Sequence, residues 1–239
     1  MKEQPNWFPK VHMMPSEWVM PDHFPDLSEY TEIAIDVETR DPGLKTTGPG
    51  WVAGRGEIVG IAVAVDGWEG YFPIAHETPP NMDKNIVTKW LKKQCSYDYM
   101  NYVFHNAFYD LGWLSTLGID IRGKIIDTLI AAPLVDENRF RFDLNSLTKD
   151  YLKESKSETQ LYEAAKMWGI DPKSELWKLP ASHVGAYAEQ DAAVTLRLWH
   201  HLKKEIISQN LLNIFELEID LFPVLFKMKQ EGVRVDLDK

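Results

Sequence analysis

The order of the predicted strands and helices constrains the fold of this chain more than any other feature. In residues 31–38 (TEIAIDVE) the side chains alternate between an apolar face and a face with carboxylates, a period of two that predicts a strand. The runs IVGIAVAV and GYFPIA predict two more strands soon after. Strands then alternate with helices, which we expect over 82–93 (helix), 97–104 (strand), 108–117 (helix) and 124–135 (a strand passing into a helix). This order predicts an α/β fold with a mixed β-sheet, an antiparallel meander plus parallel strands, flanked by helices.

The second half of the chain is predicted to be mainly helical. Asp143 is placed to cap the first of its helices, and the helices are expected over 144–152, 159–168, 182–207 and 211–230. The glycine-rich stretch 43–56, between the first two strands, lacks both the phosphate-loop ending and the GxGxxG spacing. We therefore expect a long hairpin loop there. Residues 1–30 are rich in prolines and aromatic side chains, which predicts an extended arm.

Composition excludes several classes of protein. Hydrophobic residues make up 44% of the chain and charged residues 26%, which is typical of a globular protein. The longest apolar run, Ile58–Val65, is far shorter than the roughly 20 residues of a membrane span. No charged-then-apolar leader opens the chain, and the one cysteine, Cys95, excludes an internal disulfide framework. We expect a cytoplasmic protein of a bacterial or phage-infected cell, without a membrane partner.

The charge balance argues against a broad basic face for nucleic acid. Thirty-six acidic residues against 26 basic ones give a formal net charge of −10, which repels phosphate over most of a surface. A cluster of carboxylates that holds divalent cations would still be compatible with a nucleic-acid substrate, because bound metals invert the local sign.

Five side chains are candidates for such a cluster. Asp36 and Glu38 leave the same face of a strand about 6.5–7 Å apart, opposite the apolar side of that strand. Asp110 follows an aromatic strand at the start of a helix, and Tyr187 and Asp191 are i and i+4 on one helix face. Each alone is more often a solvated or structural residue, so the set matters only if its members converge.

Taken in order, these residues resemble the three exonuclease motifs of the DEDD superfamily. The motifs are Asp36-x-Glu38, Asn106-x-x-Tyr109-Asp110 and Tyr187-x-x-x-Asp191, and Ala at position 186 fits the tyrosine subclass rather than the histidine subclass. The segments IIDTLIAAPLVDENRFRFDLNSLTKDYL and LEIDLFPVLFKMKQEGVRVDLDK are similar to family A, polymerase I-like DNA polymerases, and the loop DPGLKTTGPGW to phage-type ones.

The resemblance implies a ribonuclease-H-like fold and three segments. Residues 1–30 would be an N-terminal arm that the resemblance leaves unexplained, 31–210 a 3′–5′ exonuclease domain, and 211–239 the start of a linker toward a polymerase domain, which is absent from this sequence. The implied partners are the 3′ end of single-stranded DNA and a separate polymerase domain or subunit. We expect a monomer.

The resemblance also implies a two-metal site with Mg²⁺ or Mn²⁺. Asp36, Glu38 and Asp191 would hold the ion that activates water, and Asp110 the second ion. The hydroxyl of Tyr187 would orient the attacking water, since a phenol is a poor base at neutral pH. Contacts to the terminal nucleotide would come from the remaining site residues, which are Asn106, Tyr109, Thr39 and Leu44.

The implied function is metal-dependent 3′–5′ hydrolysis of DNA from single-stranded or frayed ends, with release of nucleoside monophosphates, as in proofreading. One alternative is an exoribonuclease of the RNase D type, which the polymerase-like segment after Leu211 disfavours. Another is a catalytically silent module that docks a polymerase, which the presence of all four carboxylates and the tyrosine disfavours.

Overall fold

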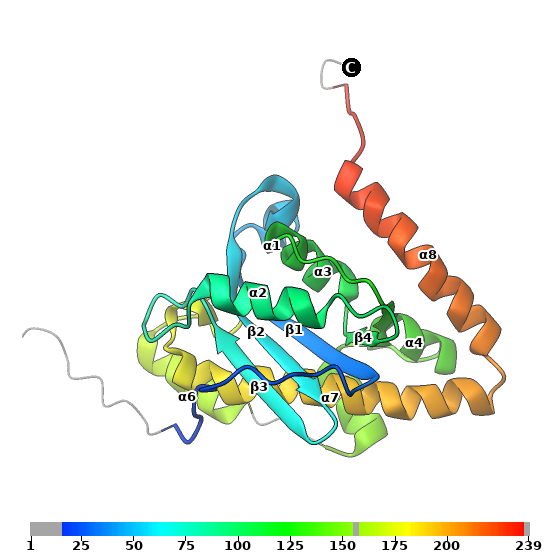
Figure 1. The fold of residues 1–239 in the computed structure, drawn as a ribbon, viewed down its shortest axis with the longest axis horizontal. Coiled ribbons are helices and arrows are strands. Elements are labelled where there is room, and N and C mark those ends of the chain that lie inside the picture. Colours follow the sequence, from blue (N-terminus) through cyan, green and yellow to red (C-terminus); the bar gives the residue numbers. More distant parts are fainter. Residues whose placement is uncertain (1–15, 155–157, 237–239) are drawn as a thin grey trace, which may run out of the picture.

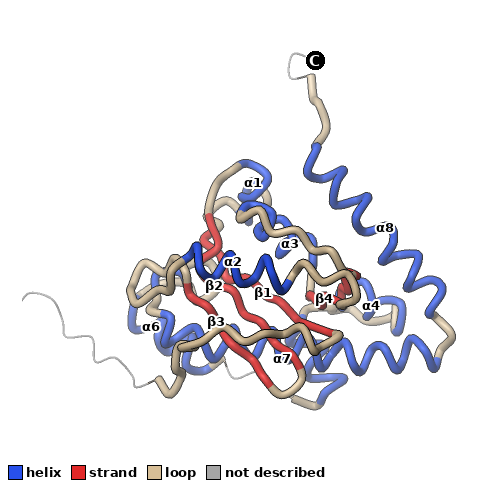
Figure 2. The backbone as a smooth tube through the Cα atoms, in the orientation of Figure 1, coloured by secondary structure: helices blue, strands red, loops and turns tan. Residues whose placement is uncertain are grey.

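A five-stranded mixed sheet lies at the centre of residues 16–154 and 158–236, the part of the chain that the computed structural model describes (Figures 1 and 2). Its strands, in spatial order, are β3 (Trp68–Pro73), β2 (Glu57–Val65), β1 (Glu32–Arg40), β4 (Asn101–Phe104) and β5 (Lys124–Asp127). The first three are antiparallel, and β1, β4 and β5 are parallel. The predicted meander and parallel strands are confirmed.

The two faces of the sheet carry different helices. Alternation along β1 sends Ile33, Ile35 and Val37 into a core with α2 (Lys84–Gln94) and α3 (Ala107–Thr116). On the other face, Ala34 belongs to a core with the long helix α7 (Ala181–Ser208). Helices α4 (Thr128–Val135), α5 (Leu144–Leu147), α6 (Thr159–Trp168) and α8 (Leu212–Glu231) also contribute to this second core.

Some predicted elements differ in detail from the observed ones. The glycine-rich stretch is a loop that contains two single-turn helices, α1 (Leu44–Thr47) and a 3₁₀ turn (Gly50–Ala53). The helix predicted over 144–152 begins as α5, with Asp143 as its cap, and ends as a π-helical turn (Thr148–Leu152). A 3₁₀ turn (Leu176–Lys178) precedes α7.

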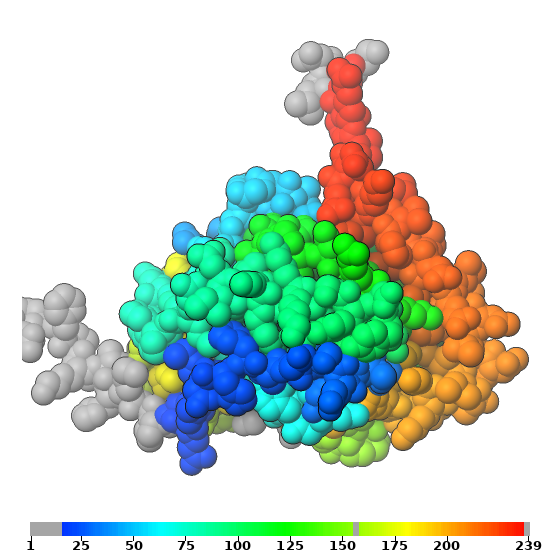
Figure 3. Space-filling view, in the orientation of Figure 1, coloured from blue at the N-terminus to red at the C-terminus, as the bar shows by residue number. Residues whose placement is uncertain are grey.

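Helix α8 (Leu212–Glu231) packs on the flank of the body through Phe215, Ile219 and Phe222 (Figure 3). Several of its apolar side chains, including Leu217 and Met228, are exposed. Neither α8 nor any other helix of the described residues combines the length and the apolar character that a membrane crossing requires.

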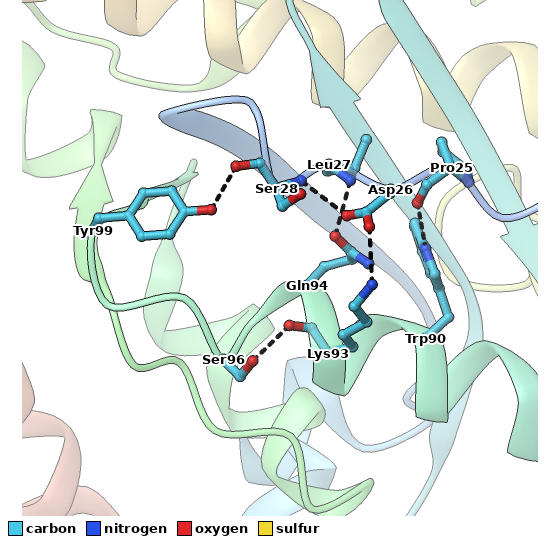
Figure 4. A network of polar contacts seen from close by, with 9 residues as sticks. All are labelled: Pro25, Asp26, Leu27, Ser28, Trp90, Lys93, Gln94, Ser96 and Tyr99. Carbon is cyan, nitrogen blue, oxygen red and sulfur yellow. Dashed lines mark hydrogen bonds and ion pairs between the residues drawn. The ribbon is translucent and has the colours of Figure 1, made fainter.

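The described part of the N-terminal arm is extended and held by polar contacts to α2 and the turn after it (Figure 4). The Trp90 indole donates to the Pro25 carbonyl at 2.8 Å, and the Leu27 amide donates to the side chain of Gln94 at 3.1 Å. Asp26 pairs with Lys93 at 3.0 Å. The predicted arm is therefore seen from residue 16 on, whereas Trp7 and Phe8 lie outside the described residues, as do positions 237–239 of the predicted linker.

Candidate active site

The carboxylates of Asp36 and Glu38 lie on the face of β1 that is covered by α7. Asp36 pairs across the sheet with Ala62, which pairs in turn with Tyr71, and Glu38 pairs with Gly60. Both carboxylates are half-buried. The predicted arrangement, two carboxylates on one face of a central strand, is what the register produces.

A glycine beside Glu38 makes room for a tyrosine ring. A Cβ built on Gly60 would lie only 1.9 Å from the hydroxyl oxygen of Tyr71, so that hydroxyl fills the gap that the missing side chain leaves. Burial raises the pKa of Tyr71 well above its ordinary value, and the charges of Glu38 and Asp36 raise it further. A neutral phenol therefore lies next to the carboxylate pair, at the strand partner of Glu38.

His76 fixes the orientation of that phenol. Its Nδ1 lies 2.9 Å from the Leu179 carbonyl, which can only accept, so Nδ1 carries the proton. Nε2 then accepts from the Tyr71 hydroxyl at 2.6 Å. Burial lowers the pKa of His76 to about 4, so the imidazole is neutral at pH 7. This chain of contacts connects the end of β3 to the segment just before α7.

Asp110 reaches the pair from α3. Asn106, at φ 74°, turns the chain from β4 into this helix. Asp127 at the end of β5 holds the turn by accepting from the amides of Asn106 and Ala107 at 2.9 and 2.8 Å. Asp110 is buried and its Oδ1 accepts from the Val37 amide at 3.1 Å. Burial raises the pKa of Asp110 well above its ordinary value, and the nearby charge of Asp36 raises it further.

Tyr187 and Asp191 reach the pair from α7. Asp191 is 7% exposed and Tyr187 is half-buried. Burial raises the pKa of Tyr187 well above its ordinary value, and the charge of Asp191, with which it forms a hydrogen bond, adds to this effect. Glu38 and Asp36 raise it as well. The four carboxylates and the tyrosine named from the sequence thus share one electrostatic environment.

The predicted nucleotide-contacting residues fall into two groups. Thr39, Leu44 and Tyr109, which include the sequence neighbours of Glu38 and Asp110, line a single cavity of about 390 Å³ together with two lysines, Lys45 and Lys173. Tyr109 and Thr39 are joined there by a hydroxyl contact of 2.6 Å. The side chain of Asn106 is exposed and does not line this cavity.

The donor set has the chemistry that hard divalent cations require. Four carboxylates are crowded enough that Asp36 raises the pKa of Asp110, and a cation would relieve that repulsion. The side chains are nevertheless not arranged in a coordination geometry. Within residues 16–154 and 158–236, no three His, Cys, Asp or Glu side chains are placed to hold a metal. Asp110 and Asp191 are instead engaged by the Val37 amide and the Tyr187 hydroxyl.

Three residues of this environment were missed by the sequence motifs. Tyr71 and His76 support Glu38, and Asp127 holds the turn before Asp110. An isolated glycine inside an apolar strand, Gly60, is a recognised sign of a close approach by another group. This glycine was the one sequence signal that a group such as the Tyr71 ring packs against the strand.

Comparison with known proteins identifies the family. The model of the 3′–5′ exonuclease of family A DNA polymerases matches residues 19–207. The chain belongs to this family. A DNA-directed DNA polymerase of Pseudomonas phage M6 is 37% identical over 232 residues, which are 94% of this chain and 35% of the relative. DNA polymerase I of Pseudomonas aeruginosa is 30% identical over 220 residues, 88% of this chain and 22% of the relative.

Two points define the scope of these matches. The chain spans about a third or less of the length of these polymerases. Solved structures with the same ribonuclease-H-like fold include Brucella melitensis NrnC (TM-score 0.63, 19% identity, 88% of this chain and 91% of that one). Escherichia coli RNase D, an exoribonuclease, is another (TM-score 0.59, 15% identity, 86% of this chain and 46% of that one). Identities this low establish the fold alone. The family model and the polymerase relatives identify the chain as a 3′–5′ exonuclease domain of the polymerase type.

Proposed function

We propose that this exonuclease domain hydrolyses DNA from single-stranded or frayed 3′ ends, with two divalent metal ions, and releases nucleoside monophosphates. The observation that carries the proposal is the meeting of Asp36, Glu38, Asp110 and Asp191 with Tyr187 at one place, in a chain whose relatives are DNA polymerases. Such a domain would remove misincorporated nucleotides as a monomer, joined to or associated with a polymerase.

The carboxylates are assigned to the metals. Asp36, Glu38 and Asp191 would hold one Mg²⁺ or Mn²⁺ ion and Asp110 the other. When bound, the ions would supply a nucleophilic hydroxide at neutral pH and charge neutralisation at the phosphorus. Burial of Asp110 next to Asp36 supports this assignment, because a site that disfavours two neighbouring negative charges favours a cation.

Tyr187 is assigned to orienting the attacking water. Its raised pKa keeps the phenol protonated at neutral pH, so it can donate or accept a hydrogen bond but cannot act as the general base. Its position on the same helix as Asp191 would aim that hydrogen bond at the water beside the carboxylates.

The cavity lined by Thr39, Leu44 and Tyr109 is assigned to the terminal nucleotide. Leu44 and Tyr109 would contact the base and sugar, and Thr39, which is joined to Tyr109, would hold the ring of the tyrosine in place. A cavity of about 390 Å³ is of the size that small ligands occupy. Asn106 would contact the nucleotide from outside the cavity.

The test is hydrolysis of a 5′-labelled single-stranded oligonucleotide by the purified chain. We expect stepwise shortening in Mg²⁺ or Mn²⁺, none in excess EDTA, and none with Asp36→Ala. Asp66→Ala, at an exposed turn, is the matched control and should remain active. Full activity in EDTA would contradict the metal mechanism.

Further arms of the same assay separate the alternatives. RNA shortened faster than DNA would favour the RNase D-type function. No release of nucleotide under any metal would favour a silent docking module. Extension of a template-paired primer would contradict the assignment of this chain to an exonuclease domain.

A further inference from the structure

The N-terminal arm crosses the edge of the sheet. β3 is one of the two edge strands, and its consecutive residues Tyr71 and Phe72 point to opposite faces of the sheet. Trp18 of the arm meets Tyr71 edge-on at 6.1 Å between ring centroids, and Phe24 stacks on Phe72 at 5.5 Å. The arm thus touches the α7 side of β3 first and the α2 side six residues later.

Trp18 is seated in a notch of α7. A Cβ built on Gly185 would lie 2.1 Å from the indole ring, so only glycine leaves space for that ring. The indole Nε1 donates to Glu189 Oε1 at 2.8 Å. Two residues earlier, the Ser16 hydroxyl donates to the Ser182 carbonyl in the first turn of the helix.

Glu189 connects three segments at one oxygen. Its Oε1 accepts from Trp18 and also from the backbone amide of Tyr71 at 2.9 Å. In sequence it lies between Tyr187 and Asp191, on the same stretch of α7. The arm, the edge strand and the helix that carries two of the proposed site residues therefore meet at this carboxylate.

The hydrogen bonds at Glu189 lie near a part of α7 where small apolar side chains define the position of the helix on the sheet only weakly. The part of α7 that faces the sheet is rich in small side chains, such as Ala188 and Ala192, opposite Ala62 and Ala64 of β2. Small side chains form shallow ridges, which resist sliding and rotation of a helix less than large ones do. Directional hydrogen bonds at Glu189 then help to fix this stretch of the helix.

We propose that Trp18 is a positioning residue for the proposed hydrolysis. Through Glu189 and the Gly185 notch it sets the rotation of α7, and with it the place of Tyr187 and Asp191 against Asp36 and Glu38. Trp18 also lines, together with Tyr187 and Gln190, a cavity of about 430 Å³, so its effect reaches the surroundings of the tyrosine directly. The inference rests on the proposed function.

The main test compares Trp18→Phe with Trp90→Phe. Each change removes one indole donor that makes a 2.8 Å hydrogen bond to the protein, the first at α7 and the second between α2 and Pro25. We expect both to lower the melting temperature by a similar amount. Trp18→Phe should lower kcat by about tenfold with KM within about twofold, since misplacing site groups by 1 Å can reduce a rate about a hundredfold. Trp90→Phe should leave kcat unchanged.

Variants of Glu189 separate position from charge. Glu189→Gln keeps an acceptor oxygen for both donors and should retain activity within about twofold. Glu189→Ala should slow hydrolysis at least as much as Trp18→Phe, because it also removes the acceptor of the Tyr71 amide. The double variant should be no slower than Glu189→Ala, because Trp18 acts through Glu189. Equal kcat for Trp18→Phe and wild type would overturn the proposal.

A readout that needs no activity completes the test. Amide hydrogen exchange of residues 185–191 should speed up in Trp18→Phe and stay at the wild-type rate in Trp90→Phe. If wild-type protein hydrolyses nothing, the proposed function fails while this measurement still decides the role of Trp18. Unchanged exchange in both variants would overturn that role.

Discussion

The two faces of the sheet are built from the same strands and differ in what they bury. Toward α2 and α3, β1 and β2 contribute Ile33, Ile35 and Ile61, all 1% exposed or less. Toward α7, the same strands contribute Ala34 and Ala62, followed by the half-buried carboxylates. On the α2 side these two strands therefore bury large apolar side chains. The other face accepts small side chains and like charges, which lower stability and make the proposed chemistry possible.

The largest effect of a single substitution is expected at Asp110, which joins the carboxylates of the α7 face from α3. Asp110→Asn keeps an acceptor for the Val37 amide and removes a carboxyl whose pKa is raised by burial and by Asp36. We expect hydrolysis to fall by more than about a thousandfold, because a metal ligand is lost. The melting temperature at pH 8 without metal should rise, because a buried group whose charged form is disfavoured is gone.

Metal titration of the melting temperature is the check on this prediction. Millimolar Mn²⁺ should stabilise the wild type more than Asp110→Asn. A variant that is both active and less stable than the wild type would show that the carboxylate site is not organised around charge.

Neighbouring residues of β2 allow the faces to be compared directly. Ile61→Ala creates a cavity on the α2 side and should lower the free energy of unfolding by about 2–5 kcal/mol. Ala62→Val overfills the α7 side and should lower it by about 1–3 kcal/mol. Ala62 pairs with Asp36, so we expect only the second variant to reduce kcat of the folded protein. Urea unfolding and single-turnover kinetics would measure both effects, and a loss of kcat in Ile61→Ala alone would reverse the assignment.

His76 should make the α7 side sensitive to acid. The unfolded chain binds a proton at this residue with a pKa of about 6.5, whereas the folded pKa is about 4. Between these values the unfolded state binds more protons, so the free energy of unfolding falls as the pH falls. The contribution is fully present above pH 6.5 and amounts to at most about 3–4 kcal/mol.

Denaturant unfolding at several pH values would measure this slope. His76→Phe should be less stable at pH 7, since the Tyr71 hydroxyl loses its acceptor, and should have a smaller slope between pH 6.5 and 4. Tyr71→Phe loses the same hydrogen bond but keeps the buried imidazole, so it should retain most of the slope. Equal slopes in the two variants would contradict the prediction.

The smallest effect is expected at Tyr187. Tyr187→Phe removes a hydroxyl and leaves the four carboxylates, and one hydrogen bond to a charged partner contributes about 1.5–3 kcal/mol. Single-turnover hydrolysis should slow by roughly 10- to 100-fold, with the stabilisation by Mn²⁺ retained. Tyr162→Phe, at an exposed tyrosine of α6, should match the wild type. A loss as severe as that of Asp191→Ala would mean that Tyr187 does more than orient water.

Local patterns predicted most of the fold. Period-two alternation identified β1, and the helix expected over 159–168 has those bounds, ended by Gly169 at φ 67°. The strand expected over 97–104 begins only at Asn101. Tyr97 and Tyr99 alternate as strand residues do, but they pack against each other at 5.5 Å in the turn before it.

Contacts between distant segments were beyond such patterns. His76 meets the Leu179 carbonyl 103 residues away, and Trp18 meets Glu189 at a separation of 171. Neither pair leaves a periodic trace in the sequence. The motif residues could be named because their spacing is local. Their supports, Tyr71 and Asp127, required the register of the folded sheet.

The path of the arm also bears on whether copies of the protein can associate through the sheet edge. An edge strand presents unpaired amides and carbonyls to which a second molecule can add a strand. At β3 the Tyr71 amide is taken by Glu189, and the arm crosses the strand between Trp18 and Phe24, with Pro21 next to Gly70. Prolines on the arm offer no amide donors of their own. We therefore expect the arm to oppose edge-to-edge aggregation, so that shortening it should reduce solubility before it alters the fold.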